Sequence, residues 1–149
     1  MPLRATLIAL LCLLVASPAE GAADAPRSAS KALLSACERG TDQLDRAAVF
    51  EGRMRTIAGA SRMQMRFTLQ ARTPDTVRWS AVTAPGFGSW VSSAAGTSRY
   101  VYTKRVESLL APAAYRVLLR FRWTGPGGPS PSSRTVSYTH LTLPTICSV

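Results

Sequence analysis

The chain has 149 residues, of which 46% are hydrophobic and 17% charged, with ten glycines and ten prolines. This length allows one hydrophobic core of about a hundred residues once terminal segments are set aside, and this composition argues against a disordered chain. The formal net charge of +10 leaves two interpretations open. One is a surface that binds anionic polymers, and the other is an arginine bias of GC-rich coding without any ligand.

The first 23 residues have the pattern of a secretory signal peptide. Arg4 supplies a positive start, residues 5–16 form an uninterrupted apolar run expected to be helical, and small residues follow up to Ala23. Since the run is shorter than the roughly 20 residues that span a bilayer, a retained membrane anchor is the less favoured alternative. Cys12 directly follows Leu11, where a lipoprotein signal needs a small residue, so we expect it to leave with the leader. The expected location is secreted, extracellular or at the cell surface, with membrane contact only through the signal peptide.

Residues 24–46 are rich in alanine, serine and basic side chains, which predicts a mobile N-terminal arm before a domain over residues 47–134. Within the domain, apolar and polar residues alternate with the two-residue period of half-buried strands. The expected strands cover residues 47–55, 61–72, 77–81, 99–106 and 115–123, with a hairpin turn at 57–60.

The apolar sides of these strands predict the core. A strand sends alternate side chains to opposite faces, so the arginines between the apolar residues should point into water. Arg66, Arg116 and Arg120 are the expected exposed neighbours. The expected mutually buried set is Met65, Phe67, Leu69, Trp79, Tyr115, Val117, Leu119 and Phe121.

Two groups of residues are candidates for binding. Residues 84–90 form a glycine-rich loop with Phe87 and Trp90, which either binds a ligand or covers the open end of the core. If the charge serves a polyanion, the outward arginines should form one continuous face, whereas coding bias should scatter them over both sheets. The candidate polyanion face is Arg62, Arg66, Arg72, Arg116, Arg120 and Arg122.

The segment 109–119 resembles part of a fibronectin type III or immunoglobulin-like domain. In such domains a Leu and a Pro precede a Tyr whose hydroxyl bonds back to nearby backbone, an arrangement called the tyrosine corner. Here Pro112 and Tyr115 would take those roles, after Leu109 or Leu110. Together with several short strands and little helical periodicity, the resemblance implies an all-β fold, an antiparallel Ig/fibronectin III-like sandwich.

The resemblance also gives Trp79 the place of the buried tryptophan of the third strand. Such folds need a final strand after the one that contains Tyr115, and here the sequence changes character. Residues 136–145 read as the translation of a transposase-type sequencing adapter, so residues 135–149 are interpreted as an artefact, with a genuine terminal strand as the alternative. We therefore expect a sandwich that is incomplete at its C-terminal edge.

The sequence offers little catalytic chemistry. The only histidine, His140, and Cys147 both lie in the adapter-like segment. Without a native imidazole, Ser-His-Asp and Cys-His catalysis and His-ligated zinc are excluded, so no catalytic residue, cofactor or metal is expected. Cys37 is then the one native cysteine of the mature segment, and we expect a disulfide partner missing from this chain in preference to a reactive thiol.

These features predict a secreted, non-enzymatic extracellular β-sandwich module with a structural or binding role. One alternative is a protein that binds polyanions or cell-surface polymers through its outward arginines, and another is the N-terminal fragment of a larger enzyme. The expected partners are other extracellular domains or anionic surface polymers, and no nucleic acid is expected.

Export should remove the leader after Ala23, with Ala19 as the alternative site, because signal peptidase requires small residues before the cleaved bond. Mass spectrometry of the secreted product should give a mature chain that begins at Asp24. A product that retains Met1, or one that carries a lipid on Cys12, would contradict this prediction.

Overall fold

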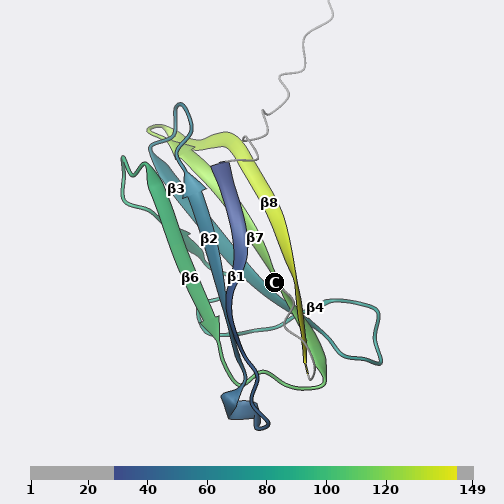
Figure 1. Ribbon diagram of the computed structural model, residues 1–149. Helices are drawn as coiled ribbons and strands as arrows, with labels where there is room; N and C mark the ends of the chain where they lie inside the picture. Colours follow the sequence, from purple (N-terminus) through teal and green to yellow (C-terminus); the bar gives the residue numbers. More distant parts are fainter. Residues whose placement is uncertain (1–28, 144–149) are drawn as a thin grey trace, which may run out of the picture.

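Two antiparallel β-sheets pack face to face in the computed structural model, which describes residues 29–143, with side-chain surroundings up to residue 127 (Figure 1). The fold is all-β, as the alternation predicts. In chain order the elements are β1 (Ser30–Glu38), the 3-10 helix η2 (Gln43–Asp45), β2 (Ala47–Arg55), β3 (Arg62–Arg72), β4 (Ser80–Ala81), β5 (Trp90–Ser92), β6 (Arg99–Val106), β7 (Ala113–Gly125) and β8 (Gly128–Leu143).

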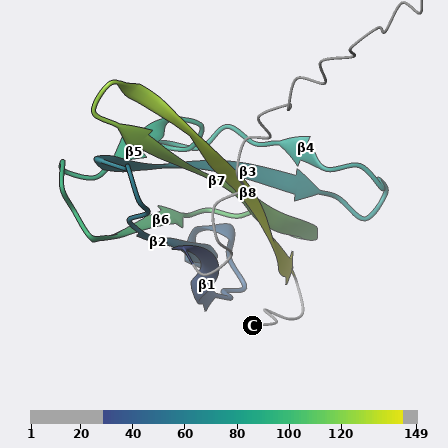
Figure 2. The same ribbon diagram turned by 90° about the horizontal axis from the view of Figure 1, so that it is seen from above.

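The strands divide between a three-stranded first sheet, in the order β1-β2-β6, and a larger second sheet, in the order β4-β3-β7-β8. Strand β5 also pairs with β3 and so belongs to the second sheet. Seen from above, the two sheets form separate layers (Figure 2). Among residues 29–143 no helix is long and apolar enough to cross a membrane.

The core lies between the sheets, and strands β3 and β7 contribute most of it. They pair in continuous register from Arg62↔Thr124 to Arg72↔Ala114, so their apolar residues face inward together. Seven of the eight expected core residues are buried, which confirms the two-residue period on these strands. They are Met65, Phe67, Leu69, Tyr115, Val117, Leu119 and Phe121.

Trp79 is the exception, and its placement in the core was wrong. Only Ser80–Ala81 pairs with β3 in this region, with Ala81 opposite Gln70. Because Gln70 points outward and residues two apart share a face, Trp79 also lies on the outer side of the sheet, where it is half-buried. The buried tryptophan is instead Trp123 of β7, which is 0% exposed and donates from Nε1 to the Arg55 carbonyl oxygen at 2.8 Å.

The segment 24–46, expected to be an N-terminal arm, contains strand β1 over Ser30–Glu38 and the 3-10 helix η2 over Gln43–Asp45. Strand β1 pairs antiparallel with β2 from Ser30↔Met54 to Glu38↔Ala47, with an irregularity between Leu34 and Ala36. The apolar side chains of Ala32 and Leu34 are buried in the core, and their burial stabilises a strand in a segment whose composition predicts an arm. Residues 24–28 lie outside the described range.

The expected hairpin at 57–60 was also wrong. A turn is present there, but β2 and β3 belong to different sheets, so the chain crosses between the layers. On β2, Gly52 faces the second sheet so closely that an added Cβ would lie 2.5 Å from Met65 Sδ and 2.8 Å from Leu119 Cδ2. Glycine at this position therefore allows the sheets to approach.

The C-terminal edge is closed by β8, whereas the sequence led us to expect a missing edge strand. Strand β8 pairs with β7 from Ala113↔Leu143 to Gly125↔Gly128, and residues 135–143 of the adapter-like segment lie within it. The physical reason is that the free edge of β7 presents backbone N–H and C=O groups that any extended segment can satisfy. Strand pairing of this kind is independent of the origin of residues 135–149, so their assignment to an adapter stays a prediction.

Replacing Phe67 with alanine should lower the free energy of unfolding by about 3–5 kcal/mol, because a fully buried ring is lost and a cavity remains. The neighbouring outward residue supplies the control, since Thr68→Ala should cost about 0.5 kcal/mol or less. Denaturant unfolding of both variants measures the difference. Equal losses would show that the two faces of β3 are assigned wrongly.

Candidate functional site: an arginine face on the second sheet

The outward side of the second sheet carries all six arginines of the candidate polyanion face. They stand on β3 and β7, whose outward residues lie opposite one another in pairs, such as Gln64↔Arg122, Arg66↔Arg120 and Gln70↔Arg116. We call this set the arginine face: Arg62, Arg66 and Arg72 of β3 with Arg116, Arg120 and Arg122 of β7. The expectation that they share one face is met by the pairing of β3 with β7.

Burial within the arginine face is uneven. Arg62, Arg72 and Arg120 are exposed, while Arg66, Arg116 and Arg122 are half-buried. Arg66 and Arg116 point outward as expected, but the expectation that they are exposed was wrong. An arginine can bury its aliphatic stem while its charged group stays near water, which burial predictions based on charge overlook.

Acidic side chains are absent from the outward positions of β3 and β7 in the described structure, whereas Arg53 and Arg105 of the first sheet form ion pairs with carboxylates. Arg105 of β6 donates to Glu38 Oε2 at 2.6 Å and to Glu107 Oε1 at 2.8 Å. The hydrogen bond from Arg105 is the largest cause that holds the pKa of Glu38 below its ordinary value. Both sheets therefore carry basic residues, but the first sheet also carries neutralising carboxylates.

Arg122 is held in place by two neighbours at one end of the arginine face. Its Nε donates to Gln64 Oε1 at 2.8 Å, and its guanidinium carbon lies 4.3 Å from the ring centroid of Trp90 on β5. A planar guanidinium stacked on an aromatic ring gains cation–π attraction, and a bonded Nε fixes its rotation.

Arg116 is held in the same way at the other end. Its Nε donates to Gln70 Oε1 at 2.7 Å, and its guanidinium carbon lies 4.4 Å from the centroid of the Trp79 ring. Arg72 approaches the same ring to 5.0 Å. The arginine face therefore contains the same arginine, glutamine and tryptophan unit twice.

The middle of the arginine face is organised differently. Arg66 and Arg120 stand directly opposite each other on adjacent strands, a pairing of like charges that is unfavourable. The Nε of Arg66 is buried and has no hydrogen-bond partner in the described structure. A buried donor without a partner is costly, so this position is under-satisfied in the free protein.

The arginines are predicted from the sequence, whereas the residues that hold them were not. Gln64 and Gln70 alternate with the outward arginines along β3, so the two-residue period already places them on the same face. The stacking of Trp79 and Trp90 on arginines depends on the pairing of β4 and β5 with β3. The sequence pattern does not predict this pairing.

Phe87 and Trp90 do not form one binding loop. Phe87 packs against the core, and the neighbouring Gly88 N–H donates to the Phe67 carbonyl oxygen at 2.7 Å, so Phe87 covers the core as the lid interpretation expects. Trp90 starts β5 and faces Arg122 on the outer side.

Cys37 is disulfide-bonded in the structure, and its partner lies outside the described residues. The expected partner beyond the end of this chain stays a prediction. His140 lies in β8, where side-chain surroundings are not described. Within residues 29–143 no group of three or more His, Cys, Asp or Glu side chains could hold a metal ion.

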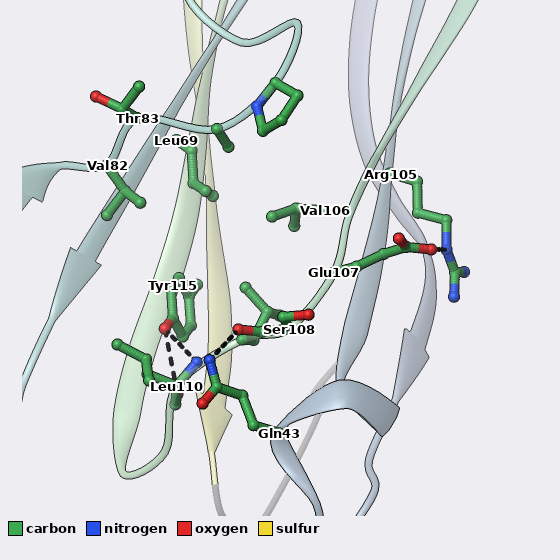
Figure 3. Close-up of a pocket in the computed structure, with 13 residues that line it drawn as sticks. Gln43, Leu69, Val82, Thr83, Arg105, Val106, Glu107, Ser108, Leu110 and Tyr115 are labelled. Carbon is green, nitrogen blue, oxygen red and sulfur yellow. Dashed lines mark hydrogen bonds and ion pairs between the residues drawn. The ribbon is translucent and has the colours of Figure 1, made fainter.

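A hollow of about 420 Å³ opens at one end of the sandwich, beside the connection from β6 to β7 (Figure 3). Leu69 and Val106 form part of its apolar wall, and Gln43 Nε2 donates to the Ser108 carbonyl oxygen at 2.9 Å on its rim. Since both sheets contribute to the wall, the hollow marks where the layers separate.

Tyr115 lines this hollow and forms the predicted tyrosine corner. Its hydroxyl accepts a hydrogen bond from the Leu110 N–H at 2.9 Å and donates to the Leu110 carbonyl oxygen at 3.2 Å. Burial is the largest cause that raises the pKa of Tyr115 above its ordinary value. The ring therefore anchors the connection that enters β7.

Comparison with known proteins finds no family model, no curated protein and no solved structure that matches this chain.

Removing the Tyr115 hydroxyl should destabilise the fold at neutral pH. Tyr115→Phe leaves both backbone groups of Leu110 without this partner, so the free energy of unfolding should fall by about 1–3 kcal/mol. The raised pKa of Tyr115 means that its stabilising contribution is present below pH 10 and is lost as pH rises through the raised value. Unfolding measured across this range should therefore show a steeper alkaline loss for the unmodified protein than for Tyr115→Phe. Parallel pH profiles would contradict the assignment.

Proposed function

We propose that this chain is an exported, non-enzymatic β-sandwich module of the fibronectin type III or immunoglobulin-like class, and that it binds anionic surface polymers through its arginine face. The single observation that carries the binding role is the gathering of six arginines on one outer sheet face without a carboxylate among them.

Two features support the proposed class. The tyrosine corner joins Tyr115 to Leu110 through both backbone groups, as the resemblance implies. The order β1-β2-β6 corresponds to the first, second and fifth strands of an immunoglobulin-type sandwich, and β3-β7-β8 corresponds to its other sheet. The buried tryptophan is on a different strand from the one found in that class, since Trp123 takes the interior position in place of Trp79.

Export is supported by the leader pattern of residues 1–23, which lie outside the described range. The non-enzymatic role is supported by the absence of histidine from residues 24–134 and by the surface positions of the described carboxylates. A module of this kind acts by contact, and its most distinctive contact surface is the arginine face.

An anionic polymer suits this face for electrostatic reasons. Like charges that are gathered without neutralising partners raise the local positive potential, attract polyanions and speed their association. The first sheet offers a natural comparison, because Arg105 and Arg53 there are engaged by Glu38 and Glu51.

Binding of dextran sulfate, with uncharged dextran as the blank ligand, tests the proposed function. Arg120→Gln/Arg122→Gln should weaken binding about tenfold or more, because two charge-assisted contacts are lost. Titration calorimetry or sedimentation at low and physiological salt measures the affinity, which should fall with added salt.

Arg55→Gln/Arg99→Gln is the matched control for this experiment. It removes the same formal charge from an exposed, directly opposed arginine pair on the first sheet. The control should change the affinity by less than about threefold, since rim charges act mainly through long-range attraction. Equal losses of affinity in the two double variants would show that binding depends only on net charge, and would refute binding through the arginine face.

A further inference from the structure

The two ends of the arginine face present prepared anion contacts. Arg116 and Arg122 each use Nε on a glutamine oxygen and lie against a tryptophan ring. Within the described structure neither guanidinium has a further hydrogen bond, so the edge formed by its two Nη groups is available. A guanidinium fixed in this way loses little entropy when it binds an oxyanion through that edge.

The centre of the face has positive charges without a counterion and a hydrogen-bond donor without a partner. Arg66 and Arg120 oppose each other, and the buried Nε of Arg66 has no partner. A single anion placed between them would offset the repulsion and accept hydrogen bonds from both side chains. The comparable pair on the first sheet, Arg55 opposite Arg99, lies at strand ends with both side chains exposed, where water screens the charges.

These three places lie in line along β7. Residues in a strand advance by about 3.3 Å each, so Arg120 lies about 7 Å from Arg122 and about 13 Å from Arg116 along the strand. The line of contacts is therefore about 20 Å long, with its centre nearer to one end. Thr68 and Leu118 occupy the interval that carries no arginine.

We infer that the arginine face is a track of three oxyanion subsites for an unbranched anionic polysaccharide that lies along the strands. This inference rests on the proposed function and specifies its ligand. The subsites are Arg122, the Arg66–Arg120 pair, and Arg116, in that order.

The same face suits other polyanions less well. Single-stranded nucleic acids bind through aromatic rings on which bases stack, but the Trp79 and Trp90 rings are already engaged by guanidinium groups. Anionic membranes favour surfaces that also insert apolar side chains. Of the large exposed apolar residues of the described structure, Leu44, Val101 and Leu110 lie outside β3 and β7, and Val77 lines a hollow beside Arg72 at one end of the face. The arginine face therefore offers at most one such side chain, at its end.

Heparin-derived oligosaccharides of graded length provide the test. For the unmodified protein, affinity should rise steeply with ligand length until the ligand spans about 20 Å and then level off. Arg122→Gln should bring the levelling point down to about 13 Å, and Arg116→Gln should bring it to about 7 Å. Each variant should also lose about tenfold in affinity for the longest ligand. Binding that rises steadily with ligand charge, with the same profile in all three proteins, would overturn the track.

Two comparisons separate this inference from the proposed function. If dextran sulfate binding depends on the arginine face but the levelling points coincide, the proposed function stands and the three-subsite track fails. If dextran sulfate binding is insensitive to substitutions in the arginine face, both fail.

Single-stranded oligodeoxynucleotides of matched charge should bind at least about tenfold more weakly than the oligosaccharides, because no free ring is offered to their bases. Equal affinity would overturn the polysaccharide assignment.

A stability measurement adds a readout that net charge does not explain. Arg120→Gln removes the like-charge opposition at the central subsite, so the melting temperature of the free protein should stay the same or rise while binding falls. Arg99→Gln removes the equivalent opposition on the first sheet and should leave binding unchanged. A fall in both stability and binding for Arg120→Gln would show that the pair supports the fold and would remove the central subsite.

Discussion

The pairing of β3 with β7 in continuous register is the constraint on which the rest of the structure depends. Both strands alternate apolar and polar residues, and antiparallel pairing places equivalent positions on the same side. The inward set forms most of the core, and the outward set brings arginines from distant parts of the sequence together. A shift of one residue in either strand would bury arginines and expose the core residues, so one register specifies both the fold and the candidate site.

The arginine face shows how a stable core permits an unfavourable surface. Opposed arginines and an unpartnered Nε at Arg66 destabilise the free protein, and the buried apolar layer beneath them compensates. Local conflicts that persist in a well-packed fold are most often found where a ligand binds. On the first sheet Arg53 and Arg105 meet carboxylates, and the opposed Arg55 and Arg99 are exposed, where water screens their charges.

The tryptophans illustrate how position changes the meaning of a residue type. Trp123 is an interior residue whose indole N–H meets a backbone carbonyl, while Trp79 and Trp90 lie against arginines on the outer side. All three rings bury apolar surface, but only the outer two can orient a charged group. Trp79 and Trp90 lie beside or in the short strands β4 and β5. The burial of each ring therefore depends on which residue of β3 it faces.

The sequence by itself determined the strands with strong alternation, their inward and outward faces, the tyrosine corner and the set of arginines. These are local properties, because a two-residue period and a Leu-Pro-Tyr pattern are visible within one segment. Tertiary structure alone decided that β1 completes the first sheet, that β8 covers the edge of β7, and that Trp79 lies outside. It also decided that Gln64, Gln70 and two tryptophans fix Arg116 and Arg122. Each of these depends on which strands become neighbours, and strand pairing is a contact between segments far apart in the chain that no single segment encodes.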